Sequence, residues 1–136
     1  MKPFILVLLV CFFSFRLEAQ DCTELKNDPE IRQELQDLAN TAANKLMNCC
    51  SSFGGRNNRA EIHWEKDETG VCRTRISRLT NKITITMTAY WNGSVSGAQY
   101  WIKGRLVVDM ENRTQTWEKI SDSGGFSGGC GKSCIN

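Results

Sequence analysis

Histidine is nearly absent from the sequence, because His63 is its only example among 136 residues. One imidazole leaves one candidate general base for a serine or cysteine nucleophile, and one histidine ligand for a metal. A phosphate-binding loop is also missing. Gly131-Lys132-Ser133 matches the end of that motif, but Phe126 stands where its first glycine is required. We therefore predict neither nucleotide binding nor any cofactor.

A dominant charge is missing as well. The chain has 17 Lys and Arg against 15 Asp and Glu, and residues 1–19 contain Lys2, Arg16 and Glu18, so 15 basic and 14 acidic side chains follow. A net charge near +1 gives no general attraction to nucleic acid or to an anionic membrane. We predict no nucleic-acid partner, and we expect any partner attracted by charge to bind a local patch.

Only one long apolar run occurs, and it lies at the N-terminus. Met1-Lys2 provides a positive start, residues 3–15 are almost all apolar, and Arg16 to Ala19 form a polar exit. This run is shorter than the roughly 20 residues of a membrane-spanning helix, and the three parts are typical of a signal peptide. We expect cleavage after residue 19, secretion (periplasmic in a bacterial host), and no membrane span in the mature chain.

Cysteine is plentiful after the signal. The mature chain has six: Cys22, Cys49, Cys50, Cys72, Cys130 and Cys134. An even number in a small exported domain indicates disulfides. A zinc site is the alternative, but it would favour Cys-x2-Cys pairs or more histidine. We predict one domain at 20–122, followed by a Gly- and Cys-rich tail at 123–136 that disulfides attach to it.

One amphipathic helix is predicted near the start of the mature chain. Asp28 is a favourable N-cap, Pro29 suits the first turn, and Glu30 suits the positive end of the helix dipole. Apolar residues then recur at helical spacing up to a predicted end near Asn48. They are Ile31, Leu35, Leu38, Ala42 and Leu46.

From Ala60 onward the apolar period changes to two, which indicates strands. The predicted strands are 60–66, 71–79, 82–91, 98–110 and 114–121, with turns at 67–70, 80–81, 92–97 and 111–113. Such short connections leave no room for crossover helices and predict antiparallel pairing. The expected fold class is α+β, with the N-terminal helix packed on one face of a four- to five-stranded, disulfide-stapled meander.

The length of the helix limits the disulfide pairing. A helix of about 30 Å separates Cys22 from Cys49 and Cys50, whereas a disulfide needs Cα atoms within roughly 7 Å. A bond between the adjacent Cys49 and Cys50 is strained. Six connectivities survive, and each joins the tail to the end of the helix and excludes a Cys130–Cys134 bond. We therefore expect Phe126 and Lys132 to be held against the domain.

Two groups of side chains are candidates for chemistry. Glu61, His63 and Glu65 share one face of the first strand and suit a metal or an acid–base pair. The alternative is that Arg73 and Arg75 on the neighbouring strand form ion pairs with the two carboxylates.

The second group is the sheet face turned away from the helix. Alternation predicts that Tyr100, Ile102, Leu106, Val108 and Met110 face the helix. It places the candidate binding residues on the wet side, with Thr84, Thr86 and Thr88 beside them. These candidates are Tyr90, Trp101, Lys103, Arg105 and Trp117. Aromatic rings beside cations can stack on sugars or bind an acidic protein patch. The alternative is a cross-strand aromatic cluster that the cations keep soluble.

The predicted 92–97 turn carries two further signals. Asn92-Gly93-Ser94, like Asn112-Arg113-Thr114, is a glycosylation sequon within a predicted turn. The helix–strand–loop–strand order resembles that of the cystatins, and Gly93 to Gly97 resembles their Gln-x-Val-x-Gly loop. The glutamine and the Pro-Trp second loop are absent, and the cysteines differ, so we assign no family.

The leading hypothesis is a secreted binding or inhibitory module that uses the open sheet face or the 92–97 hairpin loop, and not an enzyme. Its partner would be a protein or a carbohydrate. The alternatives are a small extracellular hydrolase that uses Glu61, His63 and Glu65, or a structural or coat protein. Substitutions separate these hypotheses: Glu65→Gln with His63→Ala should abolish a hydrolase, whereas Trp101→Ala should impair a binding module.

Overall fold

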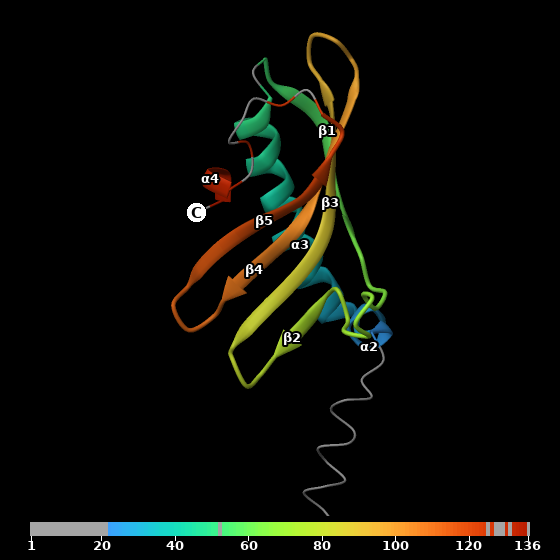
Figure 1. Cartoon of the computed structure of the whole chain (residues 1–136), viewed down its shortest axis with the longest axis vertical. Coiled ribbons are helices and arrows are strands. Elements are labelled where there is room, and N and C mark those ends of the chain that lie inside the picture. The colour runs from blue at the N-terminus through green and yellow to red at the C-terminus, as the bar shows by residue number, and fades with distance from the viewer. Residues whose placement is uncertain (1–21, 52, 125, 127–129, 131, 136) are drawn as a thin grey trace, which may run out of the picture.

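A computed structural model describes residues 22–51, 53–124, 126, 130 and 132–135. They form a helix packed with a five-stranded antiparallel sheet and three disulfides (Figure 1). The elements are α2 (Thr23–Asn27), α3 (Pro29–Cys50), β1 (Gly55–Ile62), β2 (Arg75–Ser77), β3 (Lys82–Gly93), β4 (Gln99–Asp109), β5 (Thr114–Asp122) and α4 (Lys132–Ile135). No helix in this described part is long and apolar enough to span a membrane. The predicted signal peptide lies outside the described residues.

The start of α3 agrees with the sequence prediction. The Asp28 side chain accepts hydrogen bonds from the backbone N–H groups of Glu30 and Ile31, so it caps the helix. The helix continues to Cys50, two residues beyond its predicted end, and the short helix α2 precedes it without having been predicted. Its buried face is rich in alanine, which lets the helix backbone lie close to the sheet. This face consists of Leu35, Ala39, Ala42, Ala43, Leu46, Met47 and Cys50.

The sheet is organised around β3. Its order is β1-β3-β4-β5, and β2 also pairs with β3. β1 pairs with residues 87–93 of β3, and β2 pairs with residues 82–84, so the two share one edge. The prediction that each strand lies beside the next therefore fails for β1 and β2, although it holds for β3, β4 and β5. The predicted strands 60–66 and 71–79 become 55–62 and 75–77, since residues 63–74 leave the sheet between the two segments.

Trp117 lies in the core and not on the open face, which corrects its predicted position. The turn after β4 has four residues, 110–113, and not the predicted three, because Asp109 pairs with Thr114. Trp117 therefore pairs with the buried Leu106 and is 3% exposed. A one-residue change of register moves every side chain of a strand to the other face. Met110 falls in this turn and is 44% exposed, so it does not face the helix as predicted.

Glycine at position 104 makes room for this tryptophan. A Cβ atom on Gly104 would lie 2.5 Å from Cζ2 of Trp117 and would also collide with the backbone oxygen of Glu118. The indole therefore packs directly over the backbone of β4. The core on the sheet side consists of Ile62, Ile85, Met87, Ala89, Trp91, Ile102, Leu106 and Trp117.

The three disulfides match one of the six connectivities that the helix length permits. Cys22 bonds Cys72, Cys49 bonds Cys134, and Cys50 bonds Cys130, with Cα separations of 5.4, 5.7 and 5.1 Å. Two bonds thus join the tail to the end of α3. As predicted, Phe126 packs against the domain, with its ring centroid 5.5 Å from that of Trp91. Lys132 begins α4, but its side chain lies outside the described part.

The two positions 101 and 117 provide a test of this register. Trp117→Ala should lower the free energy of unfolding by about 3–5 kcal/mol because it empties a core site. Trp101→Ala should cost roughly 1 kcal/mol or less, because Trp101 is only half-buried. Chemical denaturation of both variants measures the difference. Equal losses would show that the register of β5 is wrong.

Candidate functional site

Four of the five predicted binding residues lie together on the sheet face opposite α3. Tyr90 pairs with Trp101, and Lys103 and Arg105 follow along β4 opposite Thr88 and Thr86. All four side chains are half-buried. The register therefore places the two aromatic residues opposite one another on this face, with a cation two residues along β4.

A fifth member of this surface was missed in the sequence. Arg59 pairs with Tyr90 across β1 and β3, and its guanidinium carbon lies 4.7 Å from the centre of the Tyr90 ring. This geometry is a cation–π contact. The predicted strand began at Ala60 and so excluded Arg59. Arg59 is two residues before Glu61, and this spacing places both on the same face of a strand that begins earlier. We define the open face as Arg59, Tyr90, Trp101, Lys103 and Arg105.

The cations of the open face differ in their pairing. Arg105 donates to the carboxylate of Glu118 on β5 over 3.2 Å. For Lys103, no ion pair is found within the described part of the chain. Its charge still acts on Glu65, whose carboxyl pKa it helps to lower. Lys103, next to the aromatic pair, is thus the cation best placed to bind an external anion.

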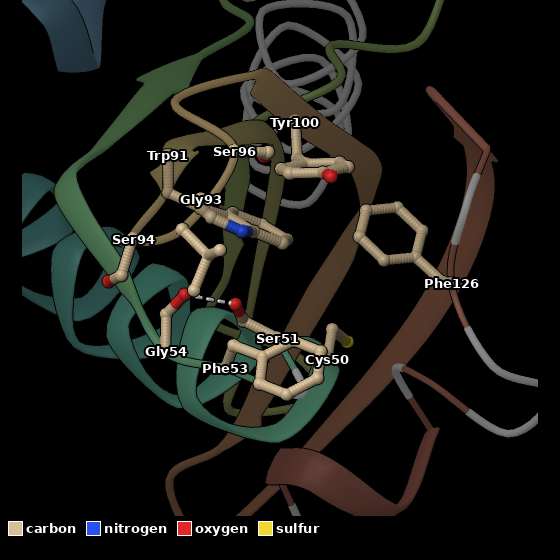
Figure 2. A pocket seen from close by; sticks show the side chains of 11 residues that line it. Cys50, Ser51, Phe53, Gly54, Trp91, Gly93, Ser94, Ser96, Tyr100 and Phe126 are labelled. Atoms are coloured by element: carbon tan, nitrogen blue, oxygen red, sulfur yellow. Dashed lines mark hydrogen bonds between the residues drawn. The ribbon is translucent and has the colours of Figure 1, made fainter.

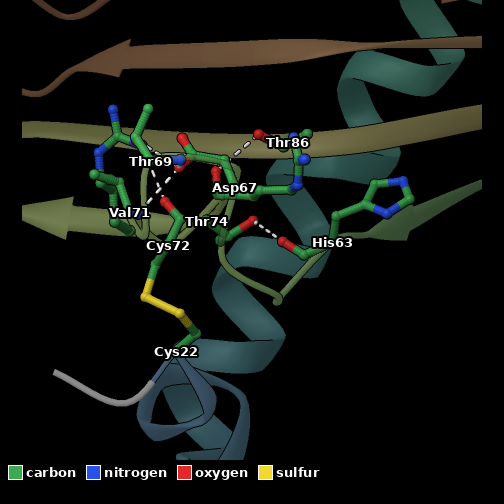
Figure 3. The surroundings of a disulfide bond; sticks show 10 residues. Cys22, His63, Asp67, Thr69, Val71, Cys72, Thr74 and Thr86 are labelled. Atoms are coloured by element: carbon green, nitrogen blue, oxygen red, sulfur yellow. Dashed lines mark hydrogen bonds between the residues drawn. A yellow bond between two sulfur atoms is a disulfide. The ribbon is translucent and has the colours of Figure 1, made fainter.

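The threonines of β3 are buried, which corrects their prediction as wet-side residues. Thr84, Thr86 and Thr88 are 7%, 1% and 4% exposed. Residues from the 63–74 segment contact two of them. The Thr86 hydroxyl donates to the carbonyl of Arg73 over 2.8 Å, near the Cys22–Cys72 disulfide (Figure 3). The Oγ1 of Thr88 shares a 2.7 Å hydrogen bond with Nε2 of His63. This segment therefore confines the open face to the Tyr90–Trp101 end of the sheet and to β4.

The predicted group around His63 is partly assembled. Nδ1 of His63 lies 3.4 Å from Oε1 of Glu65, so a hydroxyl, an imidazole and a carboxylate form a chain through Thr88, His63 and Glu65. Glu61 pairs with Thr88 in the register of β1 and β3 and shares its face. A hollow of about 620 Å³ lies beside them, lined by residues 61–66 together with Cys22, Thr23 and Lys26.

Of the two arginines predicted to form ion pairs with these carboxylates, Arg73 does so and Arg75 does not. Nε of Arg73 lies 3.6 Å from Oε1 of Glu65, which is an ion pair too long for a hydrogen bond. Arg75 instead donates to the backbone carbonyl of Cys72 over 3.0 Å. The Glu65 carboxylate therefore contacts both the imidazole of His63 and the guanidinium of Arg73, and it joins the two side chains.

The carboxyl pKa of Glu65 lies below its ordinary value. Burial raises it, but the backbone N–H of Glu65 and then the charges of His63, Arg73 and Lys103 outweigh that effect. Glu65 consequently remains ionised through the neutral pH range. An ionised carboxylate can hold the imidazole in one orientation by accepting from Nδ1.

A second cavity, of about 370 Å³, lies at the other end of the sheet (Figure 2). It opens where the end of α3, the β3–β4 hairpin loop and Phe126 meet. Figure 2 shows the rings of Trp91, Tyr100, Phe126 and Phe53 around it. The predicted hairpin loop therefore forms one wall of a cavity that alternation of polar and apolar residues did not reveal.

The remaining predicted positions are the cysteines and the sequons. The sulfurs of Cys49, Cys50 and Cys134 lie within 4.8 Å of one another, but all three belong to disulfides, so none offers a thiolate to a metal. Asn112 lies exposed in the β4–β5 turn as predicted, whereas Asn92 lies within β3 and not in a turn. No protein-family model, curated protein or solved structure matches the chain.

The pKa of Glu65 predicts a specific dependence of stability on pH. Because the folded protein holds this pKa below its ordinary 4.5, the stabilisation is complete above 4.5 and is lost as the pH falls through the folded value. Glu65→Gln should remove this contribution. Melting temperatures of both proteins between pH 7 and pH 2 should converge as the pH falls below 4.5, and parallel curves would contradict the assigned interactions.

Proposed function

We propose that the chain is secreted and acts as a binding or inhibitory module through its open face. The observation that carries this proposal is the half-exposed pair Tyr90–Trp101, with Arg59 over one ring and Lys103 beside the other. The apolar N-terminal run and the three disulfides support export. Such a module acts as an inhibitor when it covers the active site or the binding site of its partner.

The chemistry of the open face favours a partner with anionic groups beside flat apolar ones. Tyr and Trp rings offer a large contact area at little cost in side-chain entropy, and they are enriched among the residues that dominate binding energies. Within the described part of the chain, Glu118 is the one carboxylate in an ion pair with Arg59, Lys103 or Arg105, and the charge of Glu65 also acts on Lys103, so these cations outnumber the carboxylates near them. An acidic protein patch or an acidic carbohydrate fits both features.

The test begins with capture of partners from native extracellular fluid on the folded mature protein. Affinities of the captured partner are then measured for Trp101→Ala, Lys103→Ser and the control Arg32→Ser, which changes an exposed cation on α3. Trp101→Ala should weaken binding about tenfold or more, as expected for a central aromatic residue. Lys103→Ser should slow association and reduce its salt dependence.

Each result is decisive only in a folded protein, so melting temperatures accompany the affinities. The proposal fails if Trp101→Ala and Lys103→Ser bind the captured partner as tightly as the Arg32→Ser control does.

A second candidate function is hydrolysis at His63. The observation that favours it is the contact of the imidazole with Thr88 on one side and Glu65 on the other, at the edge of the 620 Å³ hollow. In this function His63 acts as general base, Glu65 orients it, and Glu61 lies on the same strand face. Thr88 is 4% exposed, which argues against attack by the threonine itself, and a water molecule is activated where it takes the place of the Thr88 hydroxyl on Nε2.

Hydrolysis is tested with chromogenic esters and glycosides on the folded mature protein. His63→Ala should lower kcat/KM by about 100-fold or more, Glu65→Gln by less, and Trp101→Ala should have no effect. Turnover by His63→Ala equal to that of the unmodified protein would exclude His63 as the base.

A further inference from the structure

The cavity at the end of α3 has walls that are mostly aromatic. The ring centroids of Trp91, Tyr100 and Phe126 lie 5.5–6.4 Å from one another. Phe53 and Val95, which line the same cavity, are 80% and 79% exposed. Large apolar side chains that face solvent around a concave site are typical of ligand pockets.

One buried donor in this cavity has no acceptor. Trp91 is 1% exposed, and its indole Nε1 has no hydrogen-bond partner among the described residues. Figure 2 shows this nitrogen in the middle of the ring of residues that line the cavity. A buried donor without an acceptor costs free energy, so an oxygen atom placed opposite it would be stabilised.

An unpaired indole is not by itself a site, because Nε1 of Trp117 is unpaired as well. Trp117 packs against Gly104 in the core and does not line this cavity. Trp91, by contrast, is one of the residues that line the cavity. Gly55 lets the backbone pack closely against one edge of its indole, since a Cβ there would lie 2.8 Å from Cδ1.

The lining also restricts the charge and size of a ligand. Among the residues that line it no side chain is charged, and the polar side-chain groups are the hydroxyls of Ser51, Ser94, Ser96 and Tyr100 and the indole N–H of Trp91. Ser51 already donates to the carbonyl of Gly54, and Ser96 accepts from the backbone N–H of Ala98. An ionic ligand would lose its hydration without gaining a counter-ion. A volume of about 370 Å³ is near the lower end of the roughly 300–1,000 Å³ of small-molecule sites.

We propose that this cavity is a second binding site, separate from the open face, for a neutral small molecule with a flat ring and an oxygen that accepts a hydrogen bond from Trp91. The ring lies in the open part of the cavity against Phe53 and Phe126, and the oxygen pairs with the indole N–H. Phe126 is four residues from Cys130, which bonds Cys50 in the cavity wall.

Two neutral probes of matched shape test the proposal on the full mature protein. Coumarin has two fused rings and a carbonyl oxygen, whereas naphthalene has two fused rings and no acceptor. In proton–nitrogen NMR spectra, coumarin should move the indole resonance of Trp91 downfield, and naphthalene should not. Coumarin should also gain roughly 2- to 10-fold in affinity from the hydrogen bond, measured as its loss in Trp91→Phe.

Variants separate this site from the open face. Trp91→Phe should lower the affinity for coumarin but not for naphthalene, Phe126→Ala should weaken both, and the open-face variant Trp101→Ala should change neither. Should Trp91→Phe not fold, the indole shift of the unmodified protein and the Phe126→Ala result decide. The proposal is overturned if coumarin does not bind up to its solubility limit, or if it binds without moving the Trp91 resonance. Neither result bears on binding at the open face.

Discussion

The packing of α3 against one face of the sheet decides which surfaces remain for function. Ala39, Ala42 and Ala43 are almost completely buried, so the helix backbone lies close to β1 and β3. This contact covers the large side chains of β3 and β4 on that face. Both candidate binding regions lie away from this contact, one on the other face of the sheet and one at its end.

The end of α3 has a second consequence, because it carries the adjacent Cys49 and Cys50. Each bonds a cysteine of the tail, and the described end of the tail, α4, contacts α3 and β5. The tail thereby supplies Phe126 as one wall of the aromatic cavity.

The 63–74 segment divides the opposite face. It leaves the sheet after β1, returns at β2, and covers the threonines of β3 with backbone and imidazole contacts. Glu65 within it links His63 to Arg73 and lies within electrostatic reach of Lys103. The histidine region and the open face are therefore neighbours that share a carboxylate. Substitutions at Glu65 have to be interpreted with both functions in mind.

Local sequence by itself determined the helix, the strand β3 and the limits on disulfide pairing. Asp28 and the apolar spacing after it specify a helix, strict alternation specifies β3, and the length of that helix keeps Cys22 away from Cys49 and Cys50. The alternation of β4 likewise placed Trp101, Lys103 and Arg105 on one face.

Only the tertiary structure decided the side of Trp117, the burial of the threonines, the contact of Arg59 with Tyr90, and the cavity around Trp91. The register of β5 depends on whether its turn has three or four residues, and composition does not fix that length. Burial of the threonines depends on a segment that leaves the sheet and returns across it. The cavity depends on Phe126, which is 35 residues from Trp91 in the chain. Periodicity reports only which residues of one strand or helix share a face, whereas these features come from contacts between segments far apart in the sequence.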